Sequence, residues 1–189
     1  MPVDTGAAVL LAVQYECMTA SWHRVRQFGR ALTARVRPEE HALVRSILPE
    51  PAVQLFQRMS RQDQRHGLDV VYCLHSQGKN APELLAAALL HDVAKVEGVG
   101  IWHRVLAVLV GAACPTWLPG LAAPLPTSWR YPLWLQAHHP QRGAELAMAA
   151  GCADDTVELI RHHHDRNGPE FPPPLYRWLV ALQAADDKA

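Results

Sequence analysis

The sequence has no excess of charge of either sign, because 18 Lys and Arg residues balance 18 Asp and Glu residues over 189 positions. Without a basic field, we expect no binding to nucleic acid or to an anionic lipid surface. Cysteine is scarce, and no two cysteines form a Cys-x-x-Cys pair. The sparse cysteines argue against a zinc ribbon or a disulfide scaffold and fit a reducing compartment, so we predict a cytoplasmic protein.

Long apolar runs are also lacking. The runs at residues 7–13 and 105–113 are far shorter than the stretch of about 20 residues that spans a bilayer. The first run has no basic residues before it and no small-residue cleavage pattern after it, so we predict neither a signal peptide nor a transmembrane segment.

No stretch alternates apolar and polar residues as a β-strand would, and apolar residues recur instead at helical spacings. The length suits one domain with a sizeable core. We therefore predict an all-α, single-domain helical bundle. Short helices are expected around Pro38 and Pro49, and an ordered loop is expected over residues 114–132. The longer predicted helices cover residues 7–36, 60–77, 82–95, 101–113, 140–150, 155–164 and 175–187.

Histidine is abundant, with eleven residues, and one of them, His91, lies in the stretch around which the chain is organised. Residues 84–95, LLAAALLHDVAK, form an apolar helix that ends in His91, Asp92 and Lys95. Burying these polar groups is costly unless they are paired or bind a metal. An ordinary helix end with solvated polar residues is the alternative.

His66 shares the apolar face of its helix with Val70 and Cys73. It precedes His91 by 25 residues, which is enough for two antiparallel helices joined by the turn at residues 78–80. We predict that His66 lies opposite His91 and Asp92. A satisfied core histidine is the alternative.

Further histidines follow. His138 and His139 precede Pro140, which we expect to open a helix. In the run of three histidines, His163 and His164 follow the apolar positions of their helix and are predicted to point inward, whereas His162 shares a face with Glu158. A solvated histidine run is the alternative.

Near the end of the given sequence, Leu175, Leu179, Leu182 and Asp186 recur at helical spacings, so Asp186 is predicted to point toward the core. Asp187 is the weaker choice because neighbouring helical positions differ by about 100°.

The order of a histidine, a His-Asp doublet and a late aspartate resembles the HD superfamily of metal-dependent phosphohydrolases. Residues 89–95, LLHDVAK, are similar to the central motif of that superfamily. The resemblance covers about residue 60 to the end, and it implies an N-terminal helical extension over residues 1–59 and an HD domain over 60–189. His139-Pro140 and His163-His164-Asp165 also resemble the HD-GYP branch. Residues 169–172 (PEFP) stand where Gly-Tyr-Pro is expected, so we do not predict activity on cyclic di-GMP.

The resemblance implies one or two divalent metal ions per chain. Imidazole and carboxylate together suit manganese, iron, cobalt, nickel or zinc, and oxygen-rich ligation suits magnesium. The expected ligands of the primary metal are His66, His91, Asp92 and Asp186. A second metal or a bound phosphate would be held by His139, His163 and His164, with Asp92 as a bridge.

The expected activity is hydrolysis of a nucleotide or another small phosphoester by a metal-bound hydroxide, with Lys95 and Asp92 as catalytic residues. The alternatives are a non-catalytic HD domain that binds metal or nucleotide and regulates a partner, and a plain helical scaffold. The sequence leaves a homo-oligomer open.

Overall fold

The computed structural model describes residues 35–97, 124–125, 128, 131–166 and 171–189. Residues Val36–Ala189 belong to one compact unit, and residues Met1–Arg35 are assigned to another. The predicted helices over residues 7–36 and 101–113, and most of the loop predicted over 114–132, lie outside the described residues.

The described residues form seven α-helices and one 3-10 helix, with no strand among them, so the all-α prediction is confirmed. The elements are α2 (Pro38–Ile47), α3 (Glu50–Arg58), α4 (Arg61–Ser76), α5 (Pro82–Leu90), η1 (Val93–Glu97), α8 (Tyr131–Ala149), α9 (Asp154–His162) and α10 (Pro173–Asp186).

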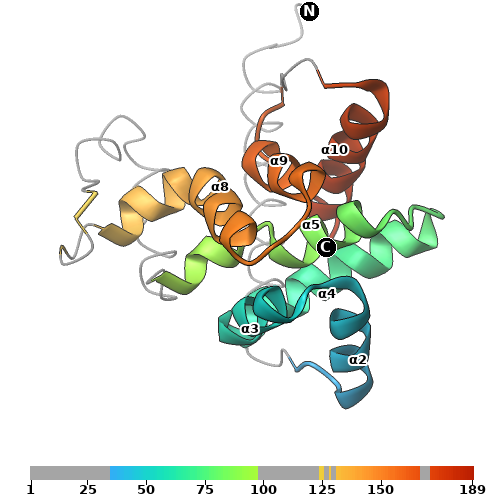
Figure 1. Ribbon diagram of the computed structural model, residues 1–189, viewed down its shortest axis with the longest axis horizontal. Helices are drawn as coiled ribbons and strands as arrows, with labels where there is room; N and C mark the ends of the chain where they lie inside the picture. Colours follow the sequence, from blue (N-terminus) through green and yellow to red (C-terminus); the bar gives the residue numbers. More distant parts are fainter. Residues whose placement is uncertain (1–34, 98–123, 126–127, 129–130, 167–170) are drawn as a thin grey trace, which may run out of the picture. The chain divides into compact units, whose positions relative to one another are not determined.

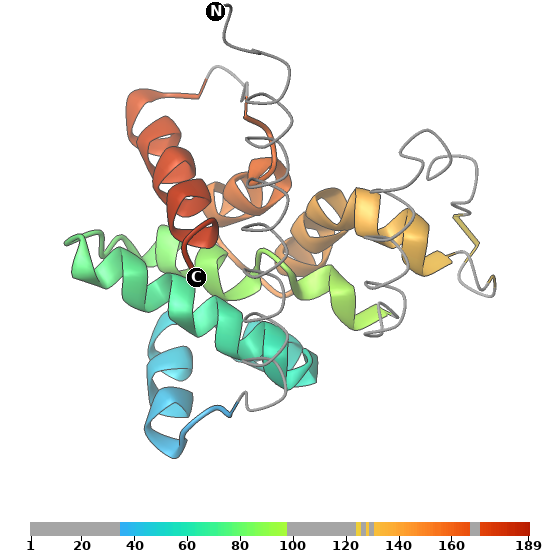
Figure 2. The ribbon, with the colours of Figure 1, turned by 180° about the vertical axis from the view of Figure 1, so that it is seen from behind.

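Helices α4 and α5 form a hairpin in the middle of the unit. Gly78, which has a positive φ of 70°, lies in the short turn between them. In both ribbon views α9 and α10 lie on one side of this hairpin and α2 lies on the other (Figures 1 and 2). Helix α8 packs against α9 and η1, and the C-terminus lies close to α4 and α5.

One hydrophobic core joins all of these helices. Its fully buried large side chains include Phe56 of α3, Leu68 and Leu74 of α4, Leu84 and Leu89 of α5, and Leu182 of α10. Because α2 and α3 contribute to this core, the domain boundary that we predicted before residue 60 falls inside the compact unit.

Local sequence signals explain most helix starts. Proline lies at the first or second position of α2, α3, α5 and α10, where its missing N–H costs nothing. Ser60 caps α4: its hydroxyl accepts from the Asp63 amide at 3.2 Å and donates to the Asp63 carboxylate at 2.7 Å.

Helix α5 ends earlier than predicted. It stops at Leu90, His91 forms its C-cap, and Lys95 belongs to the tighter η1 instead of to one helix through residue 95. The Lys95 amide donates to the Asp92 carbonyl at 3.0 Å, and in such a tighter turn side chains three residues apart lie on the same side, so Lys95 lies over Asp92.

The predicted start of α8 at Pro140 was wrong. The helix begins at Tyr131, and both His139 and Pro140 lie inside it. A proline inside a helix costs about 3 kcal/mol, but Tyr131 and Leu135 of the first half pack with Ala94 of η1 in a small apolar cluster. That packing favours helix before the proline and places His139 on a helical face.

Helix α9 starts at Asp154, with Ala153 as its N-cap and no side-chain cap. Asp154 and Asp155 lie in the first turn, where carboxylates interact favourably with the helix dipole. The helix ends at His162, and His163 is its C-cap.

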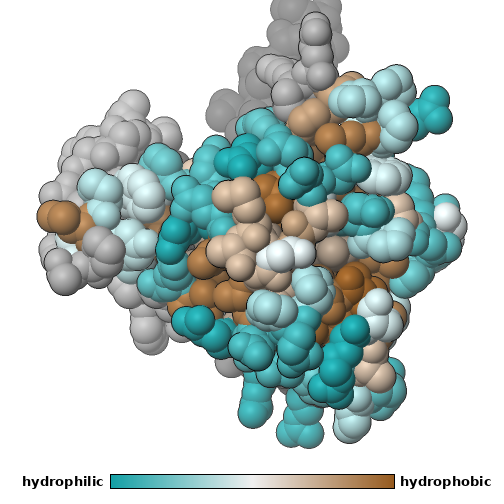
Figure 3. Space-filling model, viewed as in Figure 1, coloured by the Kyte–Doolittle hydropathy of each residue, from teal (hydrophilic) through white to brown (hydrophobic). Residues whose placement is uncertain are grey.

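The surface carries apolar as well as polar areas. Figure 3 shows apolar side chains gathered in the middle of the face viewed, with hydrophilic side chains around them. Among the described residues, no helix is both long enough and apolar enough to cross a membrane.

Candidate metal centre

Four predicted ligands form the first cluster, defined as His66, His91, Asp92 and Asp186. They come from α4, the turn after α5, and the last residue of α10. His66 Nε2 lies 2.8 Å from Asp186 Oδ1, and His91 Nε2 lies 3.5 Å from the same oxygen. His66, His91 and Asp92 each offer a ligand atom within 4.8 Å of the others. The helical phase that aimed Asp186 inward is thus confirmed.

A glycine lets α4 come close enough to α5 to build this cluster. A Cβ placed on Gly67 would lie 3.1 Å from the Leu89 carbonyl oxygen and 3.2 Å from that of Ala88. Any side chain at this position would push the two helices apart. Since His66 precedes Gly67 directly, this close crossing positions the His66 imidazole near His91.

The histidine His91 is held in a fixed orientation. Its Nδ1 donates a hydrogen bond of 3.0 Å to the Ala88 carbonyl, which can only accept. The ring is 2 % exposed, and its Nε2 has no hydrogen-bond partner among the described residues. The Nδ1 bond leaves Nε2 as the metal-facing nitrogen, as in many histidine ligands.

The remaining predicted ligands form the second cluster, defined as His139, His163 and His164. Their ligand atoms also lie within 4.8 Å of one another. His163 repeats the arrangement of His91, because its Nδ1 donates to the Ile160 carbonyl at 2.7 Å and its buried Nε2 has no partner in the described part of the chain. The prediction that His164 points inward was wrong: it follows the end of α9 and is exposed, although its ring centroid lies 4.8 Å from that of His139.

Gly143 allows α8 to pack closely against its neighbours, as Gly67 does for α4. A Cβ at Gly143 would lie 3.2 Å from the Ile160 side chain and 3.5 Å from Val93. The glycine therefore lets α8 approach both α9 and η1. Gly143 lies one helical turn after His139. The close approach at Gly143 therefore brings the part of α8 that carries His139 near α9 and η1.

Asp92 joins the two clusters. Its Oδ1 lies 3.4 Å from His139 Nε2, and its Oδ2 lies 3.6 Å from His91 Nε2. The rings of His91 and His163 are neighbours as well, with centroids 5.2 Å apart. One buried carboxylate thus faces one imidazole of each cluster, as expected of a ligand that bridges two ions.

Lys95 reaches the same carboxylate. Its Nζ lies 2.5 Å from Asp92 Oδ2, and its side chain is 15 % exposed. Two residues further on, Glu97 accepts two hydrogen bonds of 2.9 and 2.7 Å from Arg142 of α8. This ion pair ties η1 to the helix that carries His139.

The carboxylates control protonation in the first cluster. Desolvation opposes the charged form of His91, but the negative charges of Asp92 and Asp186 outweigh it and raise the pKa of His91 to about 9. Burial likewise opposes ionisation of Asp92, yet Lys95 and His91 hold its pKa well below the usual range. His66 and His91 also overcome desolvation and lower the pKa of Asp186.

The second cluster has the opposite character. Desolvation and the positive charge of His91 lower the pKa of His163 to about 2. Desolvation and His139 also lower the pKa of His164. Both imidazoles are therefore neutral at pH 7, which is the form that binds metal.

The donor set fits a metal ion. The burial of an unbonded imidazole nitrogen costs free energy unless a partner is supplied, and His91 and His163 each have such a nitrogen. Carboxylates lie beside His91, and further imidazoles lie beside His163. Mixed nitrogen and oxygen ligation of this kind suits manganese, iron, cobalt, nickel or zinc.

Two neighbouring residues stay outside the clusters, as predicted. His162 pairs with Asp165 at 2.7 Å and faces Glu158 at 3.4 Å. Asp187 pairs with Arg166 instead of with a histidine.

Several residues that shape the centre were missed from the sequence. Gly67 and Gly143 carried a usable signal, because a glycine inside a helix costs about 1 kcal/mol relative to alanine and usually has a packing reason. The pair Glu97 and Arg142 carried none, since 45 residues separate them.

Comparisons with protein-family models, with curated proteins and with solved structures find no match to this chain.

Proposed function

We propose that this chain is a metal-dependent phosphohydrolase of the HD type that acts on a nucleotide or another small phosphoester. The observation that carries the proposal is the pair of buried, unbonded Nε2 atoms of His91 and His163, whose rings are neighbours and lie beside the buried carboxylate of Asp92 and the ring of His139, respectively. A purely structural core would not leave such atoms unbonded.

The first cluster would hold one divalent ion and the second cluster another, with Asp92 shared. Bound there, such ions supply a Lewis acid for phosphate oxygens and lower the pKa of a bound water. The order of the ligands along the chain, which resembles that of HD phosphohydrolases, supports phosphoester hydrolysis over other metal chemistry.

The chain's own residues prepare the centre. Lys95 donates to Asp92 and, together with His91, favours the ionised carboxylate that a metal requires. An ammonium group has three N–H donors, so Lys95 has further donors with which to neutralise phosphate oxygens. Asp92 in turn faces both His91 and His139 and orients their rings.

Elemental analysis of the purified protein, followed by turnover assays, tests the proposal. Protein stripped with a chelator and reloaded with Mn²⁺ is offered nucleoside mono-, di- and triphosphates, simple phosphomonoesters and phosphodiesters. We expect up to two metal ions per chain and metal-dependent release of a phosphate product. A protein that holds no metal would overturn both the site and the activity.

Variants at Lys95 separate catalysis from metal binding. Lys95→Gln removes a cation that cannot ligate a metal, so turnover should fall by roughly 10- to 100-fold while metal content stays near that of the wild type. Lys79→Gln, in the exposed turn after α4, is the matched control. Metal and nucleotide binding without turnover would favour the non-catalytic regulatory domain instead.

A further inference from the structure

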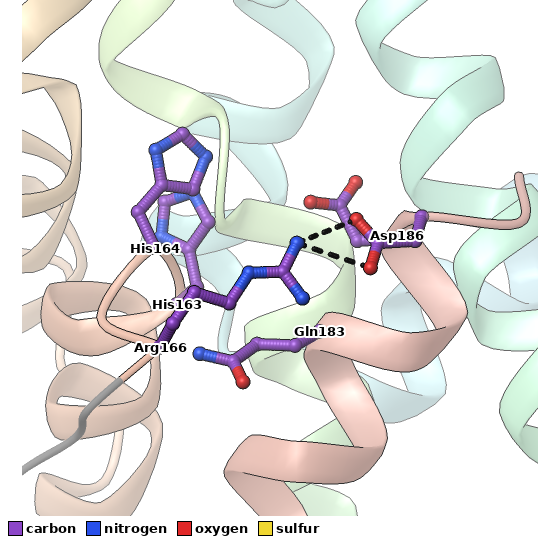
Figure 4. A pocket seen from close by; sticks show the side chains of 6 residues that line it. His163, His164, Arg166, Gln183 and Asp186 are labelled. Atoms are coloured by element: carbon purple, nitrogen blue, oxygen red, sulfur yellow. Dashed lines mark hydrogen bonds and ion pairs between the residues drawn. The ribbon is translucent and has the colours of Figure 1, made fainter. Parts of the chain in front are cut away.

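A pocket of about 270 Å³ opens beside the metal centre. Three of its lining residues, His163, His164 and Asp186, belong to the two clusters. The other walls come from residues without a role so far: Arg166, Gln183 and Asp187 (Figure 4). A molecule in this pocket would touch candidate metal ligands on one side and Arg166 on another.

Arg166 extends from the turn after α9 toward α10 across this pocket (Figure 4). Its Nη2 donates to both carboxylate oxygens of Asp187, at 2.9 and 3.0 Å. The two side chains are 67 % and 54 % exposed. Water screens an ion pair so exposed, and a ligand of higher charge can replace Asp187.

A second cross-link fixes the segment that carries Arg166. The side-chain amide of Gln183 donates to the Asp165 carbonyl at 3.1 Å, so α10 holds the backbone directly before Arg166. The guanidinium is thus kept at the rim of the pocket. Its planar fork of five N–H donors matches the oxygens of a phosphate group, and Nη2 carries only two of those donors.

The size and charge of the pocket select among phosphates. Its volume lies below the range of about 300–1,000 Å³ that is typical for drug-sized ligands, so it suits a compact group. A terminal phosphate presents three non-bridging oxygens and can face both the histidine wall and Arg166. A phosphodiester presents only two such oxygens and carries less charge.

We propose that this pocket binds the terminal phosphate of a phosphomonoester. Arg166 donates hydrogen bonds to the bound phosphate, and it pairs with Asp187 when no ligand is bound. The inference rests on the proposed function for its substrate class, because it places that phosphate against the histidines of the metal centre. Arg166 is a binding residue in this arrangement and takes no part in proton transfer.

The test measures binding of inorganic phosphate to the Mn²⁺-loaded protein by calorimetry. Arg166→Gln should weaken phosphate binding by about tenfold, as expected for the loss of a hydrogen bond to a charged group. Asp187→Asn should strengthen binding, because it releases Arg166 and removes a competing carboxylate. Arg161→Gln is the matched control, since Arg161 pairs with Glu158 on α9 and does not line the pocket.

Kinetics give an independent readout. In Arg166→Gln, KM for phosphomonoesters should rise by about the same factor as the loss of phosphate affinity, with kcat and metal content changed little. Phosphodiesters should be poorer substrates of the wild type and should be less affected by the variant. Equal phosphate affinity in wild type and Arg166→Gln, or a preference for diesters, would overturn the inference.

The outcomes for the two proposals are distinguishable. If the wild type hydrolyses phosphoesters but ignores the Arg166 substitution, the pocket inference fails and the proposed function stands. If phosphate binds in an Arg166-dependent way but no phosphoester is turned over, the anion site stands and the proposed function fails. A wild type that binds no phosphate overturns the pocket inference.

Discussion

The two clusters of the metal centre differ in composition and in origin. The first combines two imidazoles with two carboxylates, whereas the second consists of three imidazoles. The first is gathered from residues 66 to 186, while the second comes only from α8 and the end of α9. The second cluster has no carboxylate of its own, and Asp92 of the first cluster lies 3.4 Å from its His139, so the two clusters are expected to depend on each other through Asp92.

Their electrostatics differ for the same reason. The pKa of His91 is raised to about 9 beside two carboxylates, whereas the pKa of His163 is lowered to about 2 beside other imidazoles. A metal ion must therefore displace a proton from His91 in the first cluster, but it meets the neutral imidazoles of His163 and His164 in the second. We expect the first cluster to bind its ion more tightly, because its ligands carry negative charge.

The largest effect is expected where the clusters meet. Asp92→Asn keeps the shape of the side chain but removes the shared negative charge, so both ions should be lost and turnover should fall to background. Elemental analysis and a turnover assay measure this. If one ion remains fully bound, Asp92 does not bridge the clusters.

The second-largest effect should be confined to the first cluster. Asp186→Asn should lower the affinity of the first cluster for its metal ion by more than about 100-fold, because even residues that only contact a ligand contribute about 10- to 100-fold to metal affinity. Metal titration of the stripped protein measures the affinity. Asp187→Asn is the matched control and should leave metal affinity unchanged; equal losses in both variants would show that α10 is merely unfolded at its end.

His163→Ala should act on the second cluster alone. It removes a buried ligand nitrogen, so one of two ions should be lost while the first stays bound. His162→Ala should change metal content little, because His162 pairs with Glu158 and Asp165 and lies outside both clusters. Metal content per chain decides the result, and loss of metal in His162→Ala would contradict the assignment.

The metal affinity of the first cluster should depend on pH more strongly than that of the second. The imidazole of His91 holds a proton below about pH 9 in the metal-free protein and must release it to bind a metal. Metal affinity of the first cluster should therefore rise by up to about tenfold per pH unit from pH 7 toward pH 9 and then level off. Calorimetry of His163→Ala in buffers of different ionisation enthalpy measures the released proton. An affinity that is constant over this range would contradict the prediction.

The smallest effect should follow the loss of the Glu97–Arg142 pair. Arg142→Gln loosens the tie between η1 and α8, so the distance between Asp92 and His139 becomes less well fixed, and affinity for the second ion should fall by about tenfold. Glu145→Gln, which removes the other carboxylate partner of Arg142, is the control. Equal metal affinity in Arg142→Gln and wild type would make the pair irrelevant to the centre.

Much of the candidate site could be predicted from the sequence because it depends on local periodicity. The stripe of Leu175, Leu179 and Leu182 is buried, and it aims Asp186 at His66 and His91. The short turn at Gly78 makes α4 and α5 a hairpin, which brings His66 to His91. In each case the helix fixes the direction of a side chain, and burial of its apolar face fixes where the helix lies.

Other features could not be read from local pattern. The start of α8 was misplaced because proline at residue 140 is a strong local signal, yet packing of Tyr131 and Leu135 on η1 extends the helix through it. The packing of α2 and α3 into the common core was likewise not predicted, because no local signal indicates it.

The sequence by itself determined an all-helical chain and the histidines and aspartates that the structure gathers, because helical period and turn residues act over a few positions. Only the tertiary structure decided that Asp92 faces both clusters, that Glu97 ties η1 to Arg142, and that Arg166 lines a pocket beside the histidines. These relations join residues far apart in the chain, and they depend on the depth at which helices cross. That depth is set by close contacts such as those at Gly67 and Gly143, where the missing side chain lets two backbones meet.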